Sequence, residues 1–118
     1  MILKDTLYKV LSIGDNVAEI ELIPDNKIYK AHFPGKPITP GVCIIGICRE
    51  LAEEITGRSL KLIAAKDIKY QSLLTPDSSE PTRVEFSKFA DNGEEGLAIT
   101  ANVTRADVKI AKLSLVLA

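Results

Sequence analysis

A single histidine is the first candidate for chemistry in this sequence. His32 is the only imidazole among the 118 residues, and imidazole is the side chain best suited to exchange a proton near neutral pH. It lies in the stretch 31–41, which holds three prolines and two glycines. Such a stretch is unsuited to a helix or a central strand. We therefore predict an ordered loop that presents His32 as a general base.

The end of this loop carries the signal of a helix start. Thr39 is a candidate N-cap, and Pro40 suits the first helical position, where its missing N–H costs nothing. The first turn would then offer the backbone N–H groups of Gly41 and Val42, together with the positive end of the helix dipole. We therefore predict that these N–H groups form a site that stabilises a carbonyl oxygen as it gains negative charge.

The expected helix runs from about residue 40 to residue 56, and Gly57 supplies its stop. Its first half is apolar on all sides, whereas charged residues appear only in its second half. We therefore expect the first half to be engulfed and the second to reach water. Cys43 and Cys48 lie about 140° apart on this helix, so they cannot form a disulfide within it. They are interpreted as reduced core residues, and the sequence offers too few Cys and His for a metal site.

The rest of the chain shows the alternation of β-strands. A hairpin is predicted from residues 6–13 and 17–23. Further strands are predicted over 60–70, 82–90, 97–104 and 109–117. No second helix is available for parallel crossovers, so the fold class is α+β, with an antiparallel β-sheet wrapped around one long central helix.

Length and charge restrict the possible functions. The 118 residues, 46% of them hydrophobic, are predicted to form one domain over 1–118. With a net charge of −1, the chain lacks the basic footprint of a nucleic-acid-binding domain. Its apolar runs are too short for a membrane span and its first residues lack a signal-peptide core, which predicts a cytoplasmic protein. The modest core predicted at this length favours a partner chain.

The stretch 32–42 matches HFPGxPxxPGV at every fixed position. This string resembles the signature of the hotdog-fold 3-hydroxyacyl-[acyl-carrier-protein] dehydratases. The resemblance implies a hotdog fold in which His32 acts as the base and Gly41 lets an acyl thioester approach the backbone. It also implies a substrate-binding role for the residues Phe33, Gly35, Pro40, Gly41, Val42 and Gly46.

The same resemblance reveals a missing acid. The family pairs its histidine with a glutamate on the central helix, in the pattern PGVxxxE, and this chain has Gly46 there. Glu50, one helical turn further on, is the candidate replacement, followed by Glu53. The alternative is that these residues, with Arg49 and Glu54, only solvate the exposed end of the helix. Gly46 would then widen the pocket or admit a water.

The resemblance predicts a lyase that eliminates water from a 3-hydroxyacyl thioester in fatty acid or related lipid biosynthesis. No cofactor is expected, because the phosphopantetheine of an acyl carrier protein, or CoA, would carry the substrate. The expected partners are that carrier and a second copy of the chain, as a homodimer or a higher homo-oligomer. The basic residues expected to face an acidic carrier are Lys30, Lys36, Arg49 and Arg58.

Two alternatives stay open at this point. The first is a non-catalytic or partner-dependent hotdog subunit that binds acyl thioesters, with a second hotdog subunit supplying the carboxylate. The second is a hotdog thioesterase.

Overall fold

The computed structural model describes residues 2–31, 35–76 and 80–118. Its elements are β1 (Tyr8–Gly14), β2 (Val17–Leu22), α1 (Ile28–Ala31), α2 (Gly41–Thr56), β3 (Leu62–Tyr70), β4 (Thr82–Asp91), the 3₁₀ turn η1 (Gly93–Glu95), β5 (Leu97–Arg105) and β6 (Val108–Leu117). All six predicted strands are confirmed, with ends that differ from the predicted ones by no more than two residues. The short helix α1 was not predicted.

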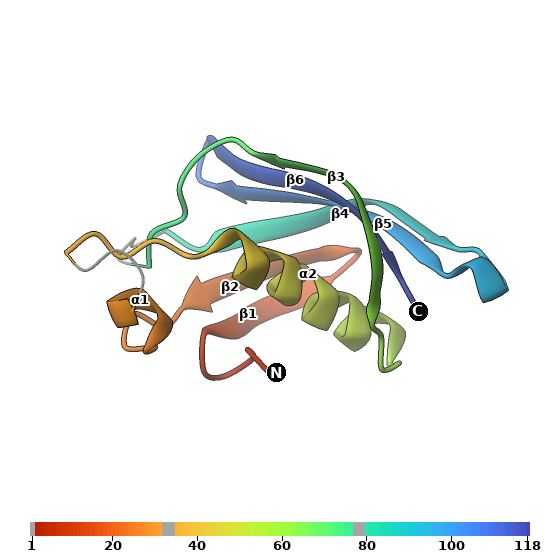
Figure 1. Cartoon of the computed structure of the whole chain (residues 1–118), viewed down its shortest axis with the longest axis horizontal. Helices are drawn as coiled ribbons and strands as arrows, with labels where there is room; N and C mark the ends of the chain where they lie inside the picture. Colours follow the sequence, from red (N-terminus) through yellow and green to blue (C-terminus); the bar gives the residue numbers. More distant parts are fainter. Residues whose placement is uncertain (1, 32–34, 77–79) are drawn as a thin grey trace.

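The strands form one antiparallel sheet in the order β1-β2-β4-β5-β6-β3. The long helix α2 lies across one face of this curved sheet, as Figure 1 shows. The predicted hairpin is confirmed, and Asp15 and Asn16 both adopt positive φ in its two-residue turn. Strand β3 follows α2 in the chain but joins the far edge of the sheet beside β6. The α+β fold class is therefore confirmed, with β1 and β3 as edge strands.

Alternating side chains of the sheet meet α2 in the core. On β5, Leu97, Ile99 and Ala101 are buried, as expected for one face of a half-buried strand. Ile47 and Leu51 of α2 belong to the same buried cluster. The period of two on the strand and the helical spacing on α2 therefore direct apolar side chains into a single core.

The ends of α2 agree only in part with the prediction. Gly57 ends the helix with a φ of 70°, and its N–H donates to the carbonyl of Glu53 at 2.8 Å, as predicted. At the other end the N-cap is Pro40, with no side-chain cap. The prediction of Thr39 as N-cap is wrong, because its hydroxyl is hydrogen-bonded to the Tyr29 hydroxyl at 2.9 Å.

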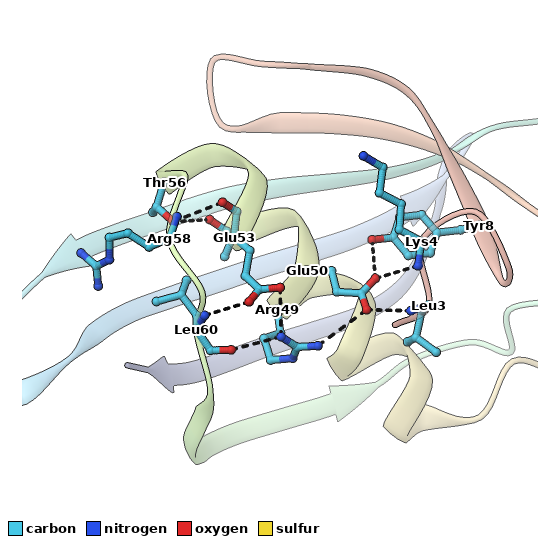
Figure 2. Close-up of polar contacts among 10 residues, drawn as sticks. Leu3, Lys4, Tyr8, Arg49, Glu50, Glu53, Thr56, Arg58 and Leu60 are labelled. Carbon is cyan, nitrogen blue, oxygen red and sulfur yellow. Dashed lines mark hydrogen bonds and ion pairs between the residues drawn. The ribbon is translucent and has the colours of Figure 1, made fainter. Parts of the chain in front are cut away.

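The burial along α2 also differs from the prediction. Val42, in the apolar first half, is 73% exposed, whereas Glu50 in the charged half is 7% exposed. The first half is therefore buried at Cys43, Ile44, Ile47 and Cys48 but open to solvent at Val42, and the second half does not simply reach water. Glu50 is buried because the chain start folds over the second half of the helix (Figure 2).

Candidate functional site

The predicted catalytic loop joins α1 to α2. His32 and Phe33 lie outside the described residues, so their predicted roles stay predictions. Gly35 adopts a φ of 87°, a left-handed conformation that favours glycine. Two helices bound the loop: α1 ends at Ala31, directly before His32, and α2 begins at Gly41.

The start of α2 carries the predicted pair of amide donors. The carbonyl of Pro40 accepts from the N–H groups of Cys43 and Ile44 at 3.0 and 3.2 Å. The N–H groups of Gly41 and Val42 precede these first helical bonds and have no acceptor within the helix. Two donors and the positive helix end can thus face a ligand oxygen.

Tyr70 occupies the space above Gly41. An ideal Cβ on Gly41 would stand 2.5 Å from the Tyr70 hydroxyl oxygen, too close for any ordinary contact, so glycine lets β3 pack on the helix start. The predicted approach of substrate over Gly41 therefore meets this ring. Beside it lies an apolar pocket of about 260 Å³, lined in part by Ile44 and Leu74. No local sequence signal identified Tyr70.

Leu3 occupies the space beside Gly46. An ideal Cβ on Gly46 would stand 2.7 Å from Leu3 Cδ1, and Leu3 itself is 7% exposed. The expectation that Gly46 widens a pocket or admits a water is therefore wrong for this chain, because an apolar side chain from the chain start fills that space.

Glu50 is buried by the same segment. Its carboxylate accepts hydrogen bonds from the backbone N–H groups of Leu3 and Lys4 at 2.7 and 2.8 Å, and from the Tyr8 hydroxyl at 2.9 Å (Figure 2). The Arg49 guanidinium Nη2 lies 3.6 Å from the Glu50 Oε2. The alternative in which Glu50 solvates an exposed helix end is therefore wrong. Burial and the nearby Glu50 charge raise the pKa of Tyr8, which keeps its hydroxyl a donor.

The other charged residues of α2 tie neighbouring segments to the helix. Glu53 accepts from the N–H of Leu60 at 2.8 Å, and Arg49 donates to the Leu60 carbonyl at 3.1 Å. Glu54 is paired with the ammonium of Lys4. The charged side chains of α2 thus bind the chain start at Lys4 and the residue Leu60, which precedes β3.

The basic residues predicted to face a carrier fall into two groups. Arg49 is paired with Glu53 at 3.0 Å, and Arg58 with Asp91 at 3.0 Å. Lys30 and Lys36 are exposed, the first directly before the predicted loop and the second within it. These two lysines are the better placed to meet an acidic surface.

Both cysteines are free and buried, as predicted. Burial raises the pKa of the Cys48 thiol to about 12 and also raises the pKa of Cys43. In the part of the chain that the structure describes, no three His, Cys, Asp or Glu side chains are grouped as a metal site requires. No helix in those residues is long and apolar enough to cross a membrane.

Solved structures with the same fold define the class of protein. The structure of the dehydratase heterocomplex ApeI:P from Xenorhabdus doucetiae superposes with a TM-score of 0.69 at 17% identity, over 93% of this chain and 96% of that chain. An uncharacterized protein from Pyrococcus horikoshii gives a TM-score of 0.68 at 14% identity, over 95% and 82%. The chain therefore has the hotdog fold.

The family follows from the sequence comparison. The model of the ApeI-like family, ApeI dehydratase, matches residues 12–102, and the chain belongs to this family. The 3-hydroxyacyl-[acyl-carrier-protein] dehydratase FabZ of Lactiplantibacillus plantarum is 28% identical over 90 residues, which cover 70% of this chain and 61% of that relative. FabZ of Ligilactobacillus salivarius is 24% identical over 106 residues, covering 84% and 76%.

Proposed function

We propose that this protein is a dehydratase that eliminates water from a 3-hydroxyacyl thioester in fatty acid or related lipid biosynthesis. The observation that carries the proposal is the string HFPGxPxxPGV at 32–42, which ends at the first turn of α2. Membership of the ApeI-like family and the two FabZ relatives support the same reaction.

The reaction requires a base, an oxyanion site and an acid. His32 removes a proton from the carbon next to the thioester carbonyl, and the electron pair moves onto the carbonyl oxygen. The N–H groups of Gly41 and Val42 stabilise that oxygen as its charge grows. The pair then forms the carbon–carbon double bond while the hydroxyl leaves with a proton as water.

The proton for the leaving hydroxyl needs a donor that Gly46 cannot supply. Absence of a positioned acid costs about 10²- to 10⁴-fold in rate. Glu50 stays a candidate, but its carboxylate already accepts from two backbone N–H groups and the Tyr8 hydroxyl. These three hydrogen bonds hold the carboxylate against the chain start and favour an anchoring role for Glu50.

A partner-dependent subunit is therefore the second candidate function, in which a second hotdog chain supplies the acid. It is favoured by the contact of Leu3 with the Gly46 position. The fold neighbour from Xenorhabdus doucetiae is itself described as a heterocomplex.

The exposed apolar residues favour an assembly over a monomer. Val42 is 73% exposed, Leu73 69% and Ile63 61%, and β3 leaves one edge unpaired in the sheet. Apolar side chains beside an open edge strand are typical of an interface. We infer that a second copy or a related hotdog chain covers this side, while Lys30 and Lys36 meet an acidic acyl carrier protein.

The test is incubation of the purified protein with 3-hydroxyacyl thioesters of acyl carrier protein and of CoA, followed by mass spectrometry. We expect loss of one water, and we expect His32→Ala to abolish it while leaving the melting temperature unchanged. The same assay with a hotdog chain encoded beside the gene separates the two candidates. Hydrolysis to the free acid would instead identify a thioesterase, and wild-type activity in His32→Ala would refute the assigned base.

A further inference from the structure

The chain start lies along one stripe of α2. This N-terminal segment, residues 2–7, lies beside Gly46, where Leu3 makes its close approach, and it also contacts Glu50 and Glu54. Figure 2 shows Leu3 and Lys4 beside Glu50. The three positions of α2 are separated by four residues each, so they share one helical face. The segment therefore covers the face on which the resemblance places the family's acid.

Leu3 is fixed by its backbone from both sides. Its N–H donates to the Glu50 carboxylate at 2.7 Å, and its carbonyl accepts from the N–H groups of Thr6 and Leu7 at 3.1 and 2.7 Å. Hydrogen bonds to an ionised carboxylate are among the stronger ones in proteins. The Leu3 side chain is thus held at Gly46 by a backbone with little freedom to move.

A small apolar pocket lies beside Leu3. Its volume is about 250 Å³, and its walls come from the N-terminal segment, from residues 26–28 and from Cys43 of α2. Ile28, in this wall, begins the helix α1 that ends one residue before His32. A pocket of this size takes the end of a short apolar group rather than a whole thioester.

We propose that this pocket receives the end of the acyl chain and that Leu3 is the residue that limits its length. The proposal rests on the proposed dehydration. Leu3 substitutes for the side chain that Gly46 lacks, so the pocket is closed by an apolar group instead of extending along the helix. The Glu50 carboxylate is a positioning group, because it accepts the hydrogen bond that holds the Leu3 backbone in place.

The test is a chain-length profile of the Leu3→Ala variant on straight-chain 3-hydroxyacyl thioesters, scored as kcat/KM for each length. Shortening Leu3 opens space beside Gly46, and one extra methylene in an apolar pocket changes kcat/KM by about 10- to 200-fold. We expect the ratio of kcat/KM for the next longer chain to that for the best wild-type substrate to rise about tenfold or more. Leu3→Val should shift the profile in the same direction by less, and it remains informative if Leu3→Ala does not fold.

The control is Leu97→Ala, another buried leucine to alanine change, at a β5 position outside the walls of this pocket. It should lower the melting temperature and leave the profile unchanged. If the wild type is active and both Leu3 variants keep its chain-length profile, the role proposed here for Leu3 is refuted, whereas the proposed dehydration stands. A wild type that dehydrates no chain length, with or without a hotdog partner, would overturn the proposed function and this inference together.

Discussion

Replacing Glu50 with glutamine tests whether the carboxylate is an anchor. In the Glu50→Gln variant the amide oxygen can still accept from Lys4 N–H and from Tyr8, but the amide nitrogen then faces the buried Leu3 N–H. An unsatisfied buried donor costs about 1–3 kcal/mol, and each bond that loses its charge weakens by about 1 kcal/mol. We therefore expect the free energy of unfolding to fall by about 3 kcal/mol, from a total that is typically 5–15 kcal/mol.

The assay is thermal unfolding followed by circular dichroism, together with hydrogen exchange of residues 2–7. A loss of about 3 kcal/mol corresponds to a drop of about 10 °C in a chain of this size, and exchange in the segment should accelerate. The matched control is Glu54→Gln, which removes a charge from the same helix but only a partly exposed pair with Lys4, and it should shift the melting temperature much less. A drop below about 3 °C for Glu50→Gln would refute the anchoring role. A loss of kcat by 10²-fold or more at unchanged stability would instead identify Glu50 as the acid.

Three further predictions follow from the packing. Gly46→Glu should lower stability by about 1–3 kcal/mol, because its side chain meets Leu3. In urea titrations the same change should cost much less when it is made in the Leu3→Ala variant, and additive losses would contradict the contact. Because burial raises the pKa of the Cys48 thiol from 9.0 to about 12, the unfolded chain releases this proton first. The free energy of unfolding should therefore decline as the pH rises from 9 toward 12. Native protein should also resist alkylation at Cys48 at pH 8, and rapid labelling seen by mass spectrometry would argue against its burial. Light scattering should give at least twice the chain mass of 12.8 kDa, and a monomer at micromolar concentration would refute self-association.

Local patterns determined much of the fold. The alternation over residues 17–23 predicted strand β2, because each strand places every second side chain on one side, and the structure buries Ala18, Ile20 and Leu22. Gly57 predicted the end of α2, because a left-handed helix stop favours glycine. The string at 32–42 predicted a hotdog dehydratase, since it fixes residue types at close spacing within one loop, and the ApeI-like family model matches residues 12–102.

The sequence by itself therefore determined the elements, the family motif and the lack of a side chain at position 46. Only the tertiary structure decided what fills the places that the glycines leave open: Leu3 beside Gly46 and Tyr70 above Gly41. It also decided that Glu50 is buried, by hydrogen bonds to residues more than 40 positions away in the chain. Helical spacing places a side chain on a face of its own helix, but the partner on that face comes from the packing of remote segments. A local pattern carries no information about that packing.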